Sequence, residues 1–539
     1  MPKVTESIDL EMQEIESLLA EARETLGEES YYKLEKLVNA YLTMSRLIED
    51  KKTTIKHLRK LLFGSTSEKT SKVAGQASGK TGGKPDVPDK PDKKKRKGHG
   101  RNGADAYQGA KKIMVPHENL KPGEGCPECK KGKVYEQKDP AVLVRITGQA
   151  PLGATVHELQ RLRCNLCGEV FTAKAPEGVG DKKYDGRSAA MIALLKYGSG
   201  FPFNRLQGLQ GSMGIPLPAS TQWDIVKEMA GELTPVYTSM IQQAAQGEVL
   251  YNDDTTMKIL ELMPGAKSTA AESSTCEDVP PDRTGVFTSG IVSTGDGHKT
   301  ALFFTGRRHA GENLEQVLNH RASELGKPIQ MCDALSRNLP GELETIVANC
   351  IAHGRRKFVD VVENFPGACG HVLEQLAEVY HNDTIARDKG LSPDERLRFH
   401  QEKSAPVMDK LLKWFKAQLK EKIVEPNSGL GEAIAYMEAH WNELTLFLRV
   451  AGAPLDNNIC ERALKKAILH RKSAMFYKTQ NGARVGDLFM SLIYTCQLMK
   501  ESPFEYLTTL IDNTPAIATR PQDWMPWNYR DTLADLETA

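Results

Sequence analysis

Long apolar runs are absent from this 539-residue sequence. No stretch approaches the roughly eighteen consecutive apolar residues that a membrane-spanning helix requires. Residues 1–6 also contain no apolar segment of the kind that a secretory signal peptide carries. We therefore expect a cytoplasmic protein with no membrane partner. The chain is longer than one hydrophobic core usually supports, so we expect roughly three to five modules.

Net charge is also nearly absent, at +1, but the charges are segregated along the chain. Acidic residues crowd the first fifty positions, whereas residues 65–101 hold eleven Lys or Arg against four Asp or Glu. Segregation of this kind favours a polyanionic partner. The run Lys93–Lys97 is a candidate contact to a phosphate backbone, although a solvated linker explains it equally well.

Cysteine is too scarce for a disulfide scaffold, since the chain has only ten. Four of them form two Cys-x-x-Cys pairs, Cys126 with Cys129 and Cys164 with Cys167. This spacing predicts a four-thiolate zinc ribbon within residues 104–178, and the alternative is a set of unmetallated core thiols. Four thiolates leave no open coordination position, so this zinc would be structural.

The N-terminal part of the chain shows a heptad repeat. Between Leu34 and Leu62, apolar residues recur every seven positions. Within residues 1–64 we therefore expect N-terminal helices and a coiled coil that pairs two chains, the alternative being an amphipathic helix packed on its own protein. Residues 65–103 are rich in Gly, Pro, Ser and Lys, and we expect a basic flexible linker there.

Residues 179–246 have a helical composition interrupted by turns that contain glycine. Ser220 is placed to cap a helix that begins with Gln222. Short helices joined in this way suit a helix-turn-helix-like DNA-binding module, with Ser220, Thr221 and Gln222 at the end that would enter the major groove. A helical linker bundle without DNA contacts is the alternative.

Carboxylates accompany three separate later elements. Asp253 and Asp254 end an apolar, β-prone run, Asp333 follows a short predicted strand, and Glu461 lies in a helix-like segment. Further strands are expected at 285–294, 299–306 and 346–351, with a helix at 310–325. This order predicts a mixed α/β sheet with its acids at strand ends. Its two parts would be residues 247–360 and 453–500, separated by a helical insertion at 361–452 and followed by a C-terminal tail at 501–539.

Acids that converge from three elements suit hard divalent cations. Magnesium is typically held by a few carboxylates, while substrate phosphates and waters fill its other positions, which points to phosphoryl chemistry on nucleic acid. Glu461 shares a helix face with Lys465, so the alternative for Glu461 is a surface ion pair. Candidates for phosphate contacts are Lys465, Arg355, Arg356, Arg471 and Lys472. His353 could position a phosphate or be a packed side chain.

These segments resemble the DDE transposases of the insertion sequence 66 family. The resemblance is carried by Asp253–Thr255, Asp333, Cys350–Phe358 and Asp456–Lys465, together with the paired Cys-x-x-Cys motifs. It extends over nearly the whole chain. It implies an RNase H-like catalytic fold with a helical insertion between the second and third acids, in a protein of the bacterial cytoplasm and nucleoid.

The resemblance also implies a reaction and its ligands. Asp253, Asp333 and Glu461 would hold two Mg²⁺ or Mn²⁺ ions, with Asp253 bridging them, and Asp254 stands where the family usually has Glu. The implied protein is a DNA transposase that binds terminal inverted repeats, cleaves the element ends and joins the 3′-hydroxyl to target DNA. It would act as a dimer or larger assembly, with accessory transposition proteins as further candidate partners.

Two other interpretations remain open at this point. One is a zinc and helix-turn-helix DNA-binding repressor whose acids only stabilise the fold. The other is an RNase H-like nuclease that cuts DNA junctions without joining strands. A magnesium site between the three acids would distinguish a transposase from the repressor. Strand-transfer products would distinguish a transposase from the nuclease.

Overall fold

The computed structural model describes residues 119–136, 149–163, 165, 167, 170–177, 182–263 and 283–538. The predicted coiled coil, the basic linker and Cys164 lie outside these residues. The chain forms two compact units. The described part of the first is residues 357–377, and the second holds the described residues up to Arg356 and from Glu378 onward. No helix in the described ranges is long and apolar enough to cross a membrane.

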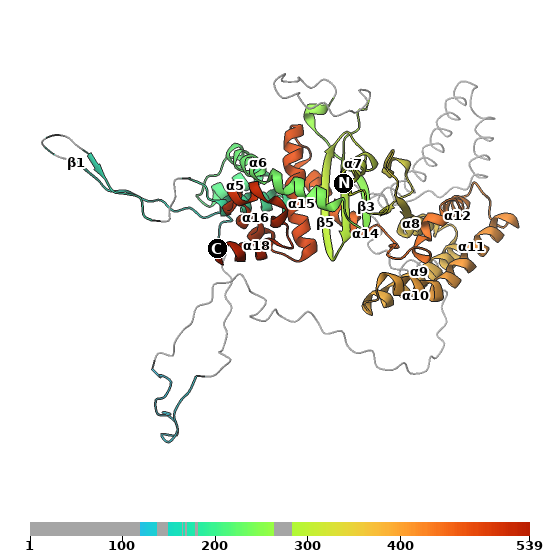
Figure 1. Ribbon diagram of the computed structural model, residues 1–539, viewed down its shortest axis with the longest axis horizontal. Coiled ribbons are helices and arrows are strands. Elements are labelled where there is room, and N and C mark those ends of the chain that lie inside the picture. The colour runs from blue at the N-terminus through green and yellow to red at the C-terminus, as the bar shows by residue number, and fades with distance from the viewer. Residues whose placement is uncertain are drawn as a thin grey trace, which may run out of the picture. The chain divides into compact units, whose positions relative to one another are not determined.

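A five-stranded mixed sheet lies at the centre of the second unit (Figure 1). The strand order is β5-β4-β3-β6-β7, in which β3, β4 and β5 are antiparallel while β6 and β7 run parallel to β3. This confirms the predicted mixed α/β sheet. The strands are β3 (Val249–Thr256), β4 (Phe287–Gly295), β5 (His298–Gly306), β6 (Ile329–Cys332) and β7 (Ile346–Asn349).

Two predicted boundaries need correction. The strand expected at 346–351 ends at Asn349, because Ile351 already begins helix α8 (Ile351–Val361). The helix expected at 310–325 is shorter, since α7 spans Ala310–Leu318. Asp253 also lies within β3 and not at its end, although β3 pairs with β6 only as far as Tyr251.

Helix α15 (Gln480–Met499) covers the free edge of the sheet at β5. Three side chains spaced four positions apart on α15, those of Asp487, Ser491 and Thr495, accept alternate backbone N–H groups of β5 at 2.6–3.0 Å. An uncovered edge strand would leave these N–H groups free to pair with another chain. The helix therefore closes this side of the sheet with side-chain hydrogen bonds.

Helices that precede the sheet in sequence share its hydrophobic core. They are α4 (Gly186–Ala193), α5 (Phe203–Ser212) and the 26-residue α6 (Ala219–Ala244). The Tyr237 hydroxyl on α6 donates to the Phe303 carbonyl at 2.9 Å, and the Ser293 hydroxyl donates to the Ala244 carbonyl at 2.7 Å. Helix α6 is thus a support for β4 and β5.

The residues after β7 are helical, as predicted for 361–452. After α8 come α9 (Pro366–Asp388), α10 (Pro393–Lys403), α11 (Ala405–Lys420), α12 (Gly429–Ala439) and α13 (Trp441–Leu444). Helix α14 (Asn458–Ala474) then returns to β3 and β4. The C-terminal residues form α16 (Pro503–Asp512), α17 (Thr514–Thr519) and α18 (Tyr529–Thr538). They are anchored by buried aromatic residues, including Tyr506, whose hydroxyl donates to the Trp524 carbonyl at 2.7 Å.

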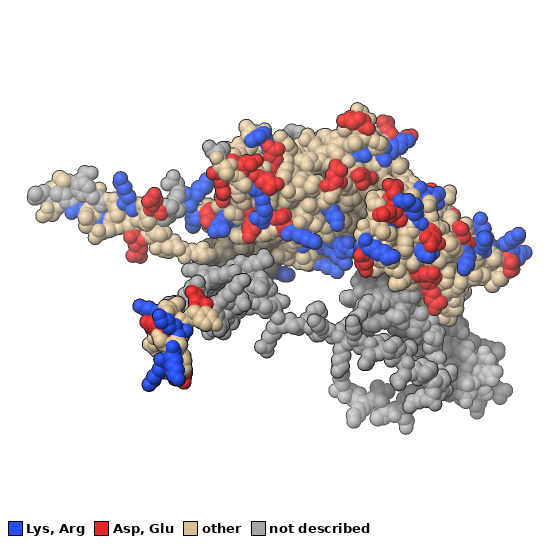
Figure 2. All heavy atoms as spheres, turned by 60° about the horizontal axis from the view of Figure 1, so that its bottom comes forward, with Lys and Arg blue, Asp and Glu red and all other residues tan. Residues whose placement is uncertain are grey.

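Lysine and arginine are interspersed with aspartate and glutamate over the face of the protein shown in Figure 2. The net charge of +1 is summed over the whole chain, so it does not describe how charge is distributed on this face. Any site that holds charges of one sign must be found from the positions of individual side chains.

Candidate active site

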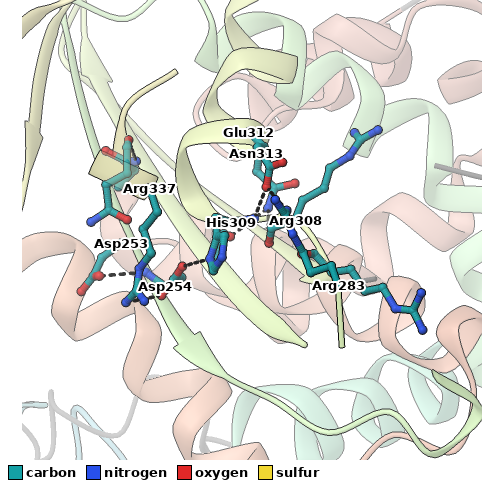
Figure 3. A network of polar contacts seen from close by, with 12 residues as sticks. Asp253, Asp254, Arg283, Arg308, His309, Glu312, Asn313 and Arg337 are labelled. Carbon is teal, nitrogen blue, oxygen red and sulfur yellow. Dashed lines mark hydrogen bonds and ion pairs between the residues drawn. The ribbon is translucent and has the colours of Figure 1, made fainter. Parts of the chain in front are cut away.

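The adjacent acids of β3 point in different directions, because successive side chains of a strand face opposite sides of the sheet. Figure 3 shows Asp254 turned toward His309 and Arg337, and Asp253 turned away from them. The Asp254 carboxylate lies 3.0 Å from His309 Nδ1 and 3.2 Å from an Arg337 nitrogen, and its side chain is only 2 % exposed. The Asp254 carboxylate is therefore already paired with two basic side chains. Asp253 is the carboxylate of β3 that remains to face the candidate site.

The network beyond Asp254 fixes the start of α7 (Figure 3). The backbone N–H of His309 donates to the Glu312 carboxylate at 2.7 Å, and Arg283 donates to the same oxygen at 2.6 Å. Burial raises the pKa of Glu312, but these hydrogen bonds outweigh burial and hold it below its usual value. The charged network ties α7 to the strand that carries Asp253.

The parallel pairing of β3 with β6 aligns two of the acids. Val249 lies opposite Ile329 and Tyr251 opposite Met331. The same offset, carried two residues further, brings Asp253 level with Asp333, which follows directly after β6. The Asn338 side-chain amide donates to the Asp333 carboxylate and limits its rotation.

The electrostatics show that Asp253 and Asp333 act on each other. Burial, and next the charge of Asp333, raises the pKa of Asp253 to about 7, and the charge of Glu461 contributes in the same direction. Burial also raises the pKa of Asp333, partly offset by the charges of His353 and Arg337. Buried carboxylates that repel one another are stabilised by a shared cation. The charges of Asp333 and Glu461 therefore both act on Asp253.

Gly290 allows α14 to approach the sheet at this site. It lies opposite Asp253 on β4, and its carbonyl accepts a hydrogen bond from the Cys460 thiol at 3.2 Å. A Cβ atom at residue 290 would lie 3.0 Å from Leu464 Cδ2, which is tighter than ordinary contact. The missing side chain therefore gives α14 the space in which Glu461 sits beside the sheet.

Asn457, one residue before α14, fixes the start of this helix. Its side-chain amide donates to the Asn252 carbonyl at 3.0 Å, and its backbone N–H donates to Cys350 Sγ at 3.3 Å. Asn457 is fully buried. It links α14 to β3 and to the residue that follows β7.

Glu461 sits beside two side chains of α8. One carboxylate oxygen lies 3.8 Å from His353 Nε2 and the other 3.9 Å from an Arg356 nitrogen. Within the described residues, the buried Glu461 Oε1 has no hydrogen-bond partner. A buried carboxylate oxygen left without a donor is the arrangement that a metal ion would complete.

One group of three metal-ligand side chains in the described ranges has its donor atoms within 4.8 Å of one another, and it consists of Cys350, His353 and Glu461. Asp253, Asp333 and Glu461 do not meet that limit together. This does not conflict with two metal ions, since the two outer acids then hold different ions. Cys350 is a poor ligand for Mg²⁺ or Mn²⁺, because its thiolate would be a soft donor and these ions favour oxygen.

The residues predicted to contact phosphates have different surroundings. Lys465 and Lys472 are exposed on α14, and Arg356 is near Glu461. Arg355 is buried. Arg471 donates to the carbonyl and hydroxyl of Thr256, so it joins the end of β3 to α14.

The helix-turn-helix interpretation fails at two of its residues. Helix α6 begins at Ala219 after Pro218, and Ser220 is not its cap. Gln222 is fully buried, and its amide donates to the carbonyls of Phe203 and Leu217 at 3.1 and 3.0 Å. It has no surface to offer a base, which contradicts the predicted DNA contact. Ser220 is exposed and Thr221 half-buried.

Part of the predicted zinc ribbon is described. The backbone N–H of Lys130 donates to the Cys126 carbonyl at 2.9 Å and that of Cys126 to the Gly132 carbonyl at 2.8 Å, which forms a tight turn around the first Cys-x-x-Cys pair. Hydrogen bonds from the backbone of this turn and from Cys126 lower the pKa of Cys129, as suits a thiolate ligand. In the second pair only Cys167 is described, next to the hairpin of β1 (Arg161–Arg163) and β2 (Val170–Thr172).

Known proteins resemble this chain over the whole of the candidate site. The model of a family described as the Transposase IS66 family matches residues 183–485. The chain belongs to this family. That span includes β3 to β7 and α14, and therefore Asp253, Asp333 and Glu461.

Relatives of this IS66 family member occur in Sinorhizobium fredii. The uncharacterized protein y4jD is 28 % identical over 359 residues, which cover 64 % of this chain and 65 % of y4jD. The uncharacterized protein y4hP is 25 % identical over 395 residues, 70 % of this chain and 68 % of y4hP. The chain thus spans about two thirds of the length of these relatives.

Proposed function

We propose that this IS66 family member cleaves DNA at the ends of an insertion sequence and joins the freed 3′-hydroxyl to target DNA. Asp253, Asp333 and Glu461 are the proposed ligands of two Mg²⁺ or Mn²⁺ ions. The observation that carries the proposal is the alignment of Asp253 with Asp333 on neighbouring parallel strands, with Glu461 of α14 adding its charge to the same site. Three antiparallel strands followed by two parallel ones support an RNase H-like fold.

The donor atoms fit divalent cations. Glu461 Oε1 is buried without a hydrogen-bond partner among the described residues, and the pKa of Asp253 is raised by burial and by the other two acids. Bound at these acids, two such ions would activate the attacking oxygen and neutralise charge on the leaving oxygen of an in-line displacement.

The protein contributes orientation. Asp253 is held by its strand and by the Asp254 N–H, which donates to its carboxylate at 2.8 Å. Asn338 orients Asp333, and Asn457 and Gly290 set the place of α14 and hence of Glu461. A water molecule attacks first, and the 3′-hydroxyl that it frees attacks target DNA second. One site serves both steps because each is a phosphoryl transfer to a different oxygen nucleophile.

A long basic segment provides a path for DNA beside Glu461. Residues 462–486 contain seven Lys or Arg and no Asp or Glu. Lys465 and Lys472 are two helical turns apart, so they share an exposed face of α14. Their charges suit separate phosphates of a strand whose scissile phosphate lies at Glu461. Such contacts position DNA without reading its sequence.

Assembly and end recognition complete the proposal. The heptads of residues 34–62 would pair two chains, so that two element ends are handled together. Cys126, Cys129, Cys164 and Cys167 would hold a structural zinc in a ribbon near the DNA. Terminal inverted repeats, target DNA and accessory transposition proteins are the proposed partners.

The experiment is a reaction of the full chain with labelled DNA that carries the sequences flanking its gene, with and without Mg²⁺. We expect Mg²⁺-dependent cleavage at the element ends and strand-transfer products. Glu461→Gln should retain end binding and lose both reactions. Binding without cleavage under all conditions would instead support a repressor. Cleavage of branched DNA without strand transfer would support a junction nuclease.

A further inference from the structure

His353 lies beside Glu461 in an arrangement that phosphate binding does not explain. Its Nε2 is 3.8 Å from Glu461 Oε1, which is too long for a hydrogen bond. Within the described residues, neither Glu461 Oε1 nor His353 Nδ1 has a hydrogen-bond partner, although both atoms are buried. Two adjacent polar side chains are thus held close together without satisfying each other.

The distance suits two ligands of one metal ion. With ligand bonds of about 2.0–2.2 Å, two donors at an angle of about 90–120° lie roughly 2.8–3.8 Å apart. His353 Nε2 and Glu461 Oε1, at 3.8 Å, lie at the upper end of that interval.

We propose that His353 is a direct ligand, together with Glu461, of one of the two divalent cations, so that this ion has nitrogen as well as oxygen donors. The inference rests on the proposed metal-dependent function. Cys350 is left out of the ligand set because thiolate is a soft donor, whereas Mg²⁺ and Mn²⁺ favour oxygen donors. An imidazole nitrogen suits a first-row transition ion such as Mn²⁺ better than Mg²⁺, whose ligands are oxygen atoms. The mixed site should therefore prefer Mn²⁺ to Mg²⁺.

Position in the fold supports this role. His353 is in the first turn of α8, whose backbone is joined to the element before α14 by a hydrogen bond from the Ile351 N–H to the Leu455 carbonyl at 3.0 Å. The Asn457 N–H contact to Cys350 adds a second link at 3.3 Å. His353 and Glu461 thus belong to two helix starts that are fixed to each other, as a two-ligand site requires.

The test is electron paramagnetic resonance of Mn²⁺ bound to the full-length protein. Pulsed measurement should show nitrogen-14 coupling to Mn²⁺ in the wild type, and His353→Gln should abolish it. The same variant should weaken Mn²⁺ binding by at least about tenfold and reduce its preference for Mn²⁺ over Mg²⁺. His381→Gln, the same substitution at an exposed histidine of α9, is the matched control and should keep the nitrogen coupling. Circular dichroism confirms that the variants are folded.

The outcomes separate this inference from the function on which it rests. Mn²⁺ binding that depends on Asp253 but shows no nitrogen coupling, or coupling that persists in His353→Gln, overturns the role of His353 and leaves the acids as ligands. Absence of Mn²⁺ binding, or binding unaffected by Asp253→Asn, overturns the metal site itself. Loss of DNA affinity in His353→Gln with unchanged Mn²⁺ spectra would assign His353 to phosphate binding instead.

Discussion

Gly290 faces Leu464 across the contact between β4 and α14, and a Cβ atom at position 290 would lie 3.0 Å from Leu464 Cδ2. Since Gly290 also lies opposite Asp253, this contact sets how near α14 comes to the acids. Gly290→Val should push α14 outward and lower the free energy of unfolding by about 1–3 kcal/mol. Chemical denaturation gives this value, and DNA cleavage should fall with it.

A matched glycine provides the control for that prediction. Gly231 lies in α6 with nothing within 4 Å of the position of its Cβ. Gly231→Ala should leave stability unchanged or raise it by up to about 1 kcal/mol, because alanine is the better helix former. Equal effects of Gly290→Ala and Gly231→Ala would show that the space beside Leu464 does not matter.

Asp254→Asn should affect stability without removing a metal ligand. The substitution removes the negative charge that pairs with His309 and Arg337 and replaces one of the two acceptor oxygens by an NH2 donor. We expect a loss of about 1–3 kcal/mol in the free energy of unfolding. Mn²⁺ affinity, measured by calorimetry, should change little, whereas Asp253→Asn should abolish binding. A loss of Mn²⁺ binding in Asp254→Asn comparable to that in Asp253→Asn would make Asp254 a ligand.

The raised pKa of Asp253 predicts a pH dependence of stability in protein stripped of divalent metal. The carboxyl titrates at about 7 in the fold and near its ordinary value when unfolded, so the native state binds more protons between these values. Its contribution to stability is therefore present at low pH and is lost as the pH rises from about 4 to about 7.

Asp253→Asn isolates that contribution, because asparagine does not titrate. Without metal, the variant should gain stability over the wild type as the pH rises through this window, by on the order of 3 kcal/mol. The difference is measured by denaturant titration at a series of pH values. Added Mg²⁺ should stabilise the wild type at pH 7 and have no effect on the variant. A pH-independent difference would show that the Asp253 carboxyl is not perturbed.

Lys465 and Lys472 should contribute salt-sensitive DNA affinity. Each phosphate contact removed lowers the slope of log affinity against log salt by about 0.9 on duplex DNA. Lys465→Ala and Lys472→Ala should each reduce the slope by about this amount, as measured by fluorescence anisotropy. Lys227→Ala, which changes an exposed lysine on α6, is the control and should leave the slope unchanged. Identical slopes in all three variants would place the DNA elsewhere.

The sheet could be predicted because its strands are short apolar runs separated by polar turns. Val249–Thr256 and Ile329–Cys332 have this pattern, and the acids near their ends pointed to a shared site. Their register could not be predicted, because the pairing of β3 with β6 depends on backbone hydrogen bonds between segments about eighty residues apart. Without the register, the sequence could not show that Asp253 and Asp333 are aligned.

Local patterns also misled where tertiary packing decided the outcome. Ser220 and Gln222 have the sequence features of a helix start in a DNA-binding module. In the structure, however, Gln222 is buried and its side-chain amide donates to two backbone carbonyls. The spacing of Asp253 and Asp254 could not show which acid faces the site, since that depends on His309 and Arg337 from distant segments. Gly290 did leave a signal, as a glycine inside an apolar strand indicates close approach of another backbone.

The most direct test is anomalous diffraction from crystals of the protein with Mn²⁺ and DNA that ends at the cleavage site. The account predicts two manganese peaks about 3.5–4 Å apart, with Asp253 bound to both, Asp333 to one and Glu461 to the other. A structure in which the DNA is engaged but no ion lies at Asp253, or in which the three carboxylates remain more than about a nanometre apart, would contradict it.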